Sequence, residues 1–197
     1  MTKGSFMDAS EMRTALEQHH KESFGWALNC CRRNQHQAEE VLQTVYLKIL
    51  EGKARFDGMS GFKTWIFSVI RKTAADERRK MFFRRLTFTP YEENSHTGDD
   101  ASADETVSRS ETQIQFLRAL DSLPARQREV LHLVFYQDLT LSNAAQVLGI
   151  SIGSTRTHYE RGKKRIRQLM EEPNVFEKPQ STGRKRPGII PTAETGR

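Results

Sequence analysis

Apolar residues recur at helical spacing over most of this chain, and no stretch alternates between apolar and polar residues as a β-strand does. Each series marks the apolar stripe of an amphipathic helix, which has to be buried against another element. The three series in the first half are Leu16, Phe24, Leu28 and Cys31; Ala38, Val41, Leu42, Val45 and Ile49; and Phe62, Trp65, Ile66, Val69, Ile70 and Ala74. The spacing predicts an all-α fold in which three N-terminal helices bury their stripes together.

A change of composition after Arg85 divides the chain into two parts. Residues 91–111 contain seven acidic residues and one Arg, and such a segment cannot form a core. Helical spacing resumes near Gln113 and stops near Met170, and four of the six prolines follow. The sequence therefore predicts two small helical domains, 12–86 and 113–170, joined by a flexible acidic linker, 87–112, and followed by a disordered tail, 171–197.

The charge and the apolar runs limit where the chain acts and what it binds. The formal net charge is +6, which favours a polyanionic partner. No apolar run approaches the roughly 20 residues that a membrane span requires, so no membrane association is expected. Residues 1–20 contain no apolar block of the kind found in secretory signals. We therefore expect a soluble, cytoplasmic protein.

The residue types needed for catalysis or metal binding do not occur in the required spacing. Cys30 and Cys31 are adjacent, and no second Cys or His pair completes a zinc site with them. No glycine-rich phosphate loop, nucleophile elbow or pair of catalytic carboxylates is present. The sequence predicts a protein that is not an enzyme and that holds neither a metal nor a cofactor, with Cys31 in the core.

The segment 139–166, LTLSNAAQVLGISIGSTRTHYERGKKRI, has the pattern of a helix-turn-helix. Gly149 follows Ala145 by four residues, where a tight turn requires a positive φ. Ile150 is expected to fill the corner and Ser151 to cap the second helix. Thr155 departs from the pattern, because an aliphatic residue usually seals the packing there. Upstream, Ser122 is expected to cap a helix whose first turn contains Pro124.

The second helix of this motif carries side chains that can read base edges, followed by cations that can neutralise phosphates. The alternative is a solvated basic helix in a small bundle. Its candidate DNA-binding residues are Ser154, Arg156, Thr157, His158, Glu160, Arg161 and Lys164.

Taken in order, these segments resemble a bacterial sigma factor of the extracytoplasmic-function (ECF) class of the sigma-70 family, over residues 16–170. AEEVLQTVYLKI (38–49) resembles the family's core-polymerase-binding helix, and FKTWIFSVIRKTAADERRK (62–80) resembles its minus-ten-recognition helix. The segment from LPARQ to KKRI (123–166) resembles its minus-thirty-five-binding domain. The resemblance implies that the domains are sigma regions 2 and 4, and that the chain directs promoter-specific initiation by core RNA polymerase through the β′ clamp coiled coil and the β flap.

In this family the minus-ten helix is anchored by its aromatic ridge, here Phe62, Trp65 and Ile66, while its basic face lies against promoter DNA. Trp65 is expected in the core, and the loop 55–61 is expected to trap extruded bases. Lys72 stands where the family often has Asn, which leaves the base preference open. The candidate residues for minus-ten recognition and melting are Arg55, Phe56, Lys63, Arg71, Lys72, Arg78, Arg79 and Lys80.

By the same resemblance, the candidate residues for binding core polymerase are Glu39, Glu40, Gln43, Thr44 and Leu47. An acid is common in the family where Thr44 stands. Phosphorylation of Thr44 would restore negative charge there. This suggests a Ser/Thr kinase as the regulating partner, with a neutral, packed Thr44 as the alternative and an anti-sigma factor as a second kind of partner.

Two further alternatives remain open at this stage. The acidic linker either occupies a basic channel of the polymerase, as in related factors, or is a plain tether. The whole chain is either a sigma factor or, as the runner-up, a stand-alone helix-turn-helix regulator. A scaffold or sigma antagonist is a third class.

Overall fold

The computed structural model describes residues 7–87 and 111–171. Within these ranges every regular element is helical, which confirms the predicted all-α fold. The N-terminal domain contains α1 (Ala9–Gln18), α2 (His20–Cys30), α3 (Gln35–Leu50) and α4 (Phe62–Thr87). The C-terminal domain contains α5 (Glu111–Asp121), α6 (Ala125–Leu131), the π-helical turn η1 (His132–Tyr136), α7 (Leu141–Leu148) and α8 (Ile152–Glu171). Residues 88–110 and 172–197, which hold nearly all of the predicted linker and tail, lie outside the described residues.

The N-terminal domain is a bundle in which α2, α3 and α4 pack against one another. The first predicted helix is two helices, because the chain breaks at His19: Leu16 lies in α1, whereas Phe24 and Leu28 lie in α2. The Asp8 side chain accepts from the backbone N–H groups of Ser10 and Glu11 and so begins α1. The prediction of a single continuous helix over this stripe was wrong.

The core of this bundle centres on Trp26, whose side chain is fully buried. Its indole Nε1 donates to the Phe67 carbonyl oxygen at 2.9 Å, which satisfies the buried donor. Ile66 and Phe67 of α4 are also fully buried, whereas Trp65 and Phe62 pack against the core only in part. The ridge that anchors α4 is therefore shifted: Phe67 fills the position expected for Trp65.

In the C-terminal domain, α8 packs along α5 and α6, and a small cluster of Leu120, Leu123 and Leu131 lies between them. The expected cap of α6 is not formed. Pro124 is itself the N-cap residue, and the Ser122 hydroxyl donates to the Ala119 carbonyl oxygen at 2.8 Å instead. The prolyl ring already restricts φ at the helix entry, so the side chain of Ser122 is not needed there.

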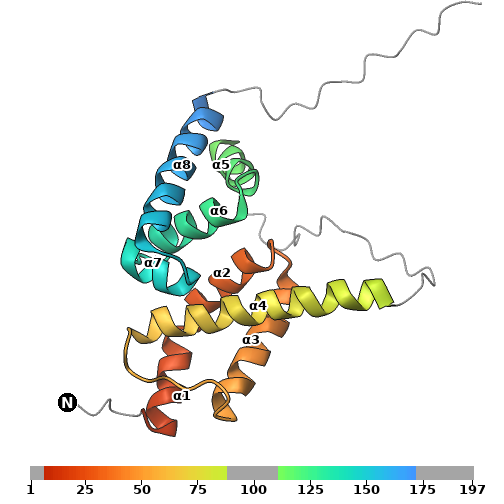
Figure 1. The fold of residues 1–197 in the computed structure, drawn as a ribbon, viewed down its shortest axis with the longest axis vertical. Helices are drawn as coiled ribbons and strands as arrows, with labels where there is room; N and C mark the ends of the chain where they lie inside the picture. Colours follow the sequence, from red (N-terminus) through yellow and green to blue (C-terminus); the bar gives the residue numbers. More distant parts are fainter. Residues whose placement is uncertain (1–6, 88–110, 172–197) are drawn as a thin grey trace, which may run out of the picture.

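The two domains pack on each other. Helix α7 lies on α4, next to α2, and α4 extends beyond the bundle as a long arm (Figure 1). Buried residues of η1 and α7, such as Leu133 and Val147, belong to the same apolar cluster as Trp26 and Ile66. The composition predicted two domains, but it did not predict that they share a core.

Candidate nucleic-acid and partner interfaces

The turn that presents α8 has the geometry expected from the sequence. Gly149 ends α7 with φ of 61°, in the left-handed region. The Ser151 Oγ accepts from the backbone N–H of Ser154 at 3.1 Å, which confirms the predicted cap. Thr155 is fully buried, and its hydroxyl donates to the Ser151 carbonyl oxygen at 3.0 Å. The threonine therefore fills the packing position that an aliphatic residue usually holds, without leaving a polar group unsatisfied.

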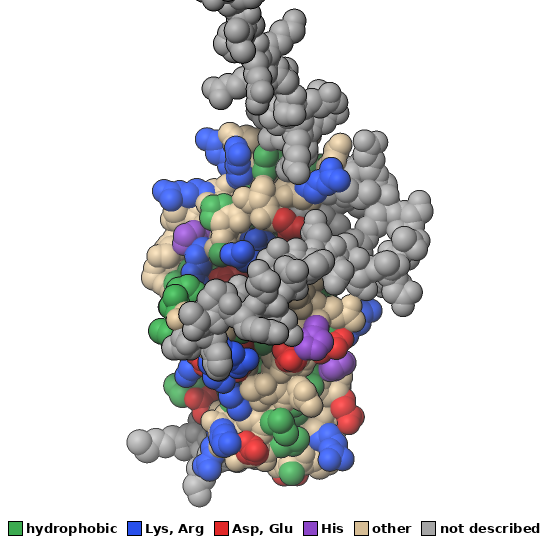
Figure 2. Space-filling model, turned by 90° about the vertical axis from the view of Figure 1, so that its right-hand side faces the viewer, with side chains coloured by type: hydrophobic (Ala, Val, Ile, Leu, Met, Phe, Trp, Pro, Cys, Tyr) green, Lys and Arg blue, Asp and Glu red, His purple; other side chains and the backbone are tan. Residues whose placement is uncertain are grey.

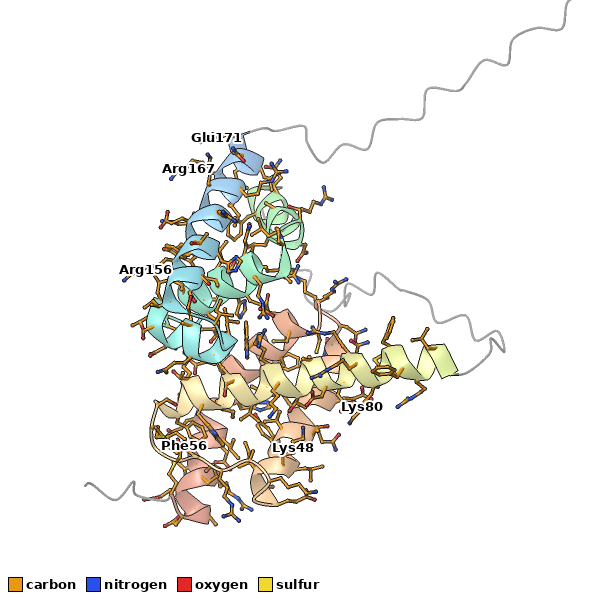
Figure 3. The ribbon with its side chains drawn as sticks, in the orientation of Figure 1. Lys48, Phe56, Lys80, Arg156, Arg167 and Glu171 are labelled. Carbon is orange, nitrogen blue, oxygen red and sulfur yellow. The ribbon has the colours of Figure 1, made fainter. Side chains whose placement is uncertain are left out.

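The predicted reading face of α8 is open to solvent. Arg156 and Arg167 lie on the outer side of the helix, away from α5 and α6 (Figure 3). Six of the seven candidate residues are exposed and His158 is half-buried; the exposed ones are Ser154, Arg156, Thr157, Glu160, Arg161 and Lys164. The predicted DNA-binding side chains therefore lie on one helix, and all of them except His158 are exposed to solvent.

Two contacts organise the middle of this face. Glu160 Oε1 and Lys163 Nζ form an ion pair at 3.0 Å. The same ammonium lies 4.4 Å from the ring centroid of Tyr159, within the range of a cation–π contact. Lys163 therefore contacts both Glu160 and Tyr159, and its positive charge partly offsets that of the carboxylate.

Charge is distributed differently over the two domains on the face shown in Figure 2. Lys and Arg side chains occur over the upper, C-terminal domain with few acids among them, whereas both signs mix over the lower, N-terminal domain. A cationic surface with few acids attracts a polyanion over a distance of about a Debye length.

The candidate cations of α4 are held by protein partners. Lys63 Nζ pairs with Glu22 Oε1 at 2.7 Å, and Arg78 Nη1 donates to the Cys30 carbonyl oxygen at 2.6 Å. Two more pair within the helix: Arg79 Nη2 with Asp76 Oδ1 at 2.6 Å, and Lys80 Nζ with Glu77 Oε1 at 2.8 Å. Lys72 is exposed.

The remaining cation, Arg71, is tied to the C-terminal domain. Its Nε lies 3.6 Å from Glu129 Oε2, and Arg126 Nη1 contacts the same oxygen at 3.0 Å. Glu129 is only 8% exposed. Burial raises the pKa of its carboxyl group, although Arg126 and Arg78 nearby act in the opposite direction.

The loop before α4 carries Phe56 against two aromatic residues of the helix. The ring centroid of Phe56 lies 5.6 Å from that of Phe62 and 5.3 Å from that of Trp65. Arg55 Nε donates to the Gly52 carbonyl oxygen at 3.1 Å, and Arg55 is exposed. The three rings form an aromatic group at the start of α4, beside the residues predicted to trap bases.

Four of the five predicted polymerase-binding residues, Glu39, Glu40, Gln43 and Leu47, are exposed on α3. Thr44 is half-buried and lines a groove of about 410 Å³ between α3 and α4. Glu40 and Gln43 line the α3 side of this groove, and Glu77, Arg78, Met81 and Arg84 line the α4 side. A group added to Thr44 would enter a space that contains both acids and arginines.

Two residues with unusual environments were missed from the sequence, Glu129 and His132. His132 stacks between Trp26 and Tyr136, with ring centroids 5.5 and 5.4 Å away. Burial lowers the pKa of its imidazole to about 4, and Arg33 adds to this effect. The sequence did contain a sign of this burial. Apolar residues around positions 130–134 lie on more than one side of a helix, which indicates that a second element packs there.

Within residues 7–87 and 111–171, no helix is long and apolar enough to cross a membrane, and no three metal-ligating side chains lie together. Cys30 and Cys31 are both buried, at 4% and 7% exposure, and both are free thiols. The expected core position of Cys31 is confirmed.

Comparisons with known proteins agree with this geometry. The family described as Sigma-70 region 2 matches residues 15–81, and Sigma-70, region 4 matches residues 119–168. The ECF RNA polymerase sigma factor SigX of Bacillus subtilis is 30% identical over 142 residues, which cover 71% of this chain and 73% of that protein. The ECF RNA polymerase sigma factor SigL of Mycobacterium tuberculosis is 25% identical over 169 residues, or 85% of this chain and 93% of that protein.

Solved structures share the fold. The sigma factor RpoE in complex with the anti-sigma factor NepR, from Bartonella quintana, matches with a TM-score of 0.63 at 21% identity, over 84% of this chain and 99% of that chain. CnrH in complex with the cytosolic domain of CnrY matches with a TM-score of 0.55 at 15% identity, over 83% and 90%.

Proposed function

Since this chain belongs to the sigma-70 family as an ECF sigma factor, we propose that it binds core RNA polymerase, recognises and melts the minus-ten element with α4, and binds the minus-thirty-five element with α8. Sigma factors of this family direct promoter-specific initiation, while the polymerase carries out the chemistry. The observation that carries the proposal is the pairing of a helix-turn-helix, whose second helix has an exposed outer face, with a cationic helix of the N-terminal domain, in the family's order.

Binding of the minus-thirty-five element is supported by the exposed face of α8. Arg156 and Arg161 are suited to phosphates or to guanine edges, and Glu160 is suited to accept from a cytosine amino group. The N-terminal end of α8 is fixed by Gly149 and Ser151, so the helix enters the groove as a rigid body.

Melting of the minus-ten element is supported by α4 and by the aromatic group before it. Each base-pair step that opens costs about 1.4 kcal/mol, which binding of the separated strands has to offset. Arg71, Lys72 and the cations 78–80 all lie on one long helix, which supports a role for them in holding the DNA backbone. Phe56 offers an aromatic surface on which an extruded base can stack.

An in vitro transcription assay tests the proposal. Transcription start sites are mapped after overexpression, and one such promoter is then transcribed by core polymerase with and without the purified chain. A defined transcript only when the chain is present is the expected result. Duplex binding without any polymerase-dependent transcript would instead identify a stand-alone regulator, and binding to neither DNA nor polymerase would identify a protein antagonist.

Docking on polymerase is proposed to use the exposed face of α3, through Glu39, Glu40, Gln43 and Leu47, with the β′ clamp coiled coil as its partner and the β flap as the partner of the C-terminal domain. The action belongs to the cytoplasm, where polymerase and promoters are. An anti-sigma factor or a Ser/Thr kinase would regulate this step. One solved structure of similar fold is the sigma factor RpoE in complex with the anti-sigma factor NepR.

If a Ser/Thr kinase regulates the chain, we propose Thr44 as the residue that it phosphorylates. This residue borders the exposed acids Glu39 and Glu40 and opens into the groove between α3 and α4. Phosphorylation adds a charge of about −1.5 to −2, which extends the acidic face toward the polymerase.

Thr44→Glu should bind core polymerase more tightly than Thr44→Ala, by about 1 to 3 kcal/mol for a charge-assisted contact. Thr14→Glu is the matched control, because Thr14 is exposed on α1, away from α3. Equal affinities of the two Thr44 variants for core polymerase would end this part of the proposal.

A further inference from the structure

A cavity of about 130 Å³ lies in the seam between the two domains, where the end of α2 meets α5, α6 and η1. Its volume is several times what one water molecule requires, so the cavity is large enough for a small ligand. Three of the described residues that line it are arginines and one is an acid, so positive charge exceeds negative charge around it. The lining residues include Asn29, Arg32, Arg33, Asp121, Arg128 and Tyr136.

The turn after α2 holds two of these arginines in an uncommon backbone conformation. The Arg33 N–H donates to the Leu28 carbonyl oxygen at 2.8 Å, which is the bond of a Schellman helix end, and Arg32 occupies the position where glycine is favoured. The φ angles are 53° at Arg32 and 64° at Arg33, both in the left-handed region. Glycine adopts this conformation at a lower cost than any residue with a Cβ. Ending α2 therefore does not require arginine at either position, which indicates that the two side chains serve another purpose.

The contacts that these arginines make within the protein are weak. Arg33 Nε lies 3.4 Å from Asp121 Oδ1, and Arg128 Nη1 donates to the Asp121 carbonyl oxygen, also at 3.4 Å. The side chains of Arg33 and Asp121 are 46% and 52% exposed, and an ion pair in solvent contributes little. Arg32 is exposed and forms no ion pair within residues 7–87 and 111–171. The three guanidinium groups therefore keep donors that an anion can use.

The charge of Arg33 also acts on two aromatic side chains at the cavity. Burial lowers the pKa of the His132 imidazole to about 4, and Arg33 adds to this effect. Burial raises the pKa of the Tyr136 hydroxyl, whereas Arg33 acts in the opposite direction. Both effects are those of a cation close to the rings. Because His132 is neutral at physiological pH, the positive charge of the cavity comes from its arginines.

Asn29 adds a donor that has no partner. Its Nδ2 is buried and makes no hydrogen bond among the residues that the structure describes, and the side chain lines the cavity. A buried amide is costly when it is left unpaired, so this group calls for an acceptor in the cavity. The oxygen of an anion held by the neighbouring guanidinium groups would be such an acceptor.

We propose that this cavity binds the phosphate group of a small ligand, with Arg32, Arg33 and Arg128 around it and Asn29 Nδ2 donating to one of its oxygens. The planar guanidinium group matches two phosphate oxygens at once, and charge-assisted hydrogen bonds of this kind are stronger than neutral ones. The proposal does not rest on the proposed function, because none of these residues is assigned to promoter DNA or to polymerase.

Tyr136 distinguishes two sources of the phosphate group. Its ring stacks on that of His132 with centroids 5.4 Å apart, and the residue is still 52% exposed. An exposed aromatic ring beside a phosphate site suits the base of a nucleotide. Inorganic phosphate and a nucleoside monophosphate share the group bound by the arginines, and they differ in whether they also use Tyr136.

Isothermal titration of the full chain with sodium phosphate and with AMP, at constant ionic strength set by chloride, tests the site. Saturable binding of one ligand per chain is expected. Tighter binding of AMP that is lost in Tyr136→Ala identifies a nucleotide site, and equal affinities identify a site for the phosphate group alone. If neither ligand gives saturable binding, the proposal is overturned.

Variants of the lining residues test which groups hold the ligand. Arg128→Gln should weaken binding about tenfold or more, because a charge-assisted contact is lost. Arg13→Gln removes the same charge at an exposed position of α1 and should leave binding unchanged. Asp121→Asn should tighten binding severalfold, because it removes the carboxylate that repels the anion and competes for Arg33.

Two further variants separate binding from folding. Arg32→Gly should raise the Tm by a few degrees, since glycine suits a φ of 53°, and yet weaken binding about tenfold or more. Asn29→Leu removes the unpaired amide at a similar side-chain volume, and should weaken binding without lowering the Tm. A purely structural role of these residues would not combine weaker binding with an equal or higher Tm.

Circular dichroism confirms that each variant is folded. If folded Arg32→Gly and Arg128→Gln bind phosphate and AMP as tightly as the unaltered chain, the proposed site is wrong. The same conclusion holds if these two variants lose affinity for a minus-thirty-five duplex but not for either small ligand, because the arginines would then belong to a DNA-binding surface.

Discussion

The basic faces of α4 and α8 carry similar residues in different states. On α4, Lys63, Arg71 and Arg78 all contact acids or carbonyl oxygens of other elements. On α8, Arg156 and Arg161 are exposed and make no ion pair with any residue in the ranges the structure describes. Arg156 and Arg161 are therefore open to a ligand as they stand, whereas Lys63 and Arg71 would each have to give up a contact with another element first.

The physical origin of the difference is where each helix packs. Helix α8 rests on its own domain through Leu169 and Gly162, which leaves its outer side free. Helix α4 is central: α2, α3 and α7 all pack against it. The packed part of a central helix finds partners for long cationic side chains within the protein, as Lys63 and Arg71 do, whereas Lys72 is exposed.

The largest expected effect concerns the exposed face of α8. Arg156→Ala should weaken binding of the preferred minus-thirty-five duplex by about 1 to 3 kcal/mol, because one charge-assisted contact to a base or phosphate is lost. Fluorescence anisotropy with a labelled duplex measures the change.

The matched control is Arg167→Ala, since Arg167 lies on the same outer side of α8 but near the end of the helix. We expect a smaller loss for this variant that is similar for all DNA sequences. Equal losses for the two variants on the preferred duplex would show that the start of α8 is not the reading end.

The second effect concerns the seam, through His132. Because burial lowers the pKa of His132 to about 4, below its ordinary 6.5, the unfolded or opened chain takes up the proton first as the pH falls. The stability that neutral His132 provides is present above about pH 6.5 and is lost as the pH falls toward 4. The loss between pH 7 and pH 5 is on the order of 2 kcal/mol.

Chemical denaturation at several pH values measures this dependence. Glu129 opposes the trend, because burial raises the pKa of its carboxyl group and its protonation favours the packed state as the pH falls. The His132→Gln variant should therefore lose the decrease in stability toward acid, or reverse it. An unchanged pH slope in that variant would show that His132 is not the titrating group.

The sequence allowed some levels of this organisation to be predicted but not others. Helical spacing, the glycine at 149 and the serine at 151 are local signals. The roles of Gly149 and Ser151 were confirmed, and the spacing predicted helices correctly except for the break at His19. The predicted cap at Ser122 was wrong, because the neighbouring Pro124 is the N-cap residue of α6. The shared core could not be predicted, because the spacing shows that a helix has an apolar stripe but not which distant element covers that stripe.

The site residues divide in the same way. The exposure of the α8 face could be predicted from side-chain types, since its residues lie on one helix. The state of Arg71 could not, because Glu129 is distant in sequence and stands in a charged stretch that gives no sign of burial. Phe67 rather than Trp65 is buried in the core. Which of the two is buried depends on how α4 is rotated about its axis, and a stripe of six apolar residues does not determine that rotation.

A third prediction concerns how α8 is held. A Cβ at Gly162 would lie 2.9 Å from Leu131 Cδ1 and 3.2 Å from Leu131 Cγ, and Leu131 is only 2% exposed. Gly162→Ala should lower the free energy of unfolding by about 1 to 2 kcal/mol, since overpacking outweighs the gain in helix propensity.

Gly153→Ala is its matched control on the same helix, because its nearest neighbour, Ser151 Oγ, would be 3.9 Å away. That variant should be neutral or more stable by up to about 1 kcal/mol in urea denaturation. Equal destabilisation by both substitutions would indicate a general effect of alanine rather than close helix packing.

The smallest effect belongs to the exposed ion pair of the seam. Arg33 and Asp121 have side-chain exposures of 46% and 52%, so Asp121→Asn should lower stability by less than about 1 kcal/mol. Denaturation at low and high salt measures the change, which should vanish at high salt. A loss well above 1 kcal/mol would mean that this pair, and not the buried Glu129, is the main polar contact holding the domains together.

The comparison between the two helices is tested most directly by measuring the affinity of the chain for two DNAs, a minus-thirty-five duplex and a minus-ten fork, before and after it binds core polymerase. The account predicts that the free chain prefers the duplex and that core binding raises affinity for the fork far more than affinity for the duplex. A free chain that already binds the fork as tightly as the polymerase complex does would contradict the account.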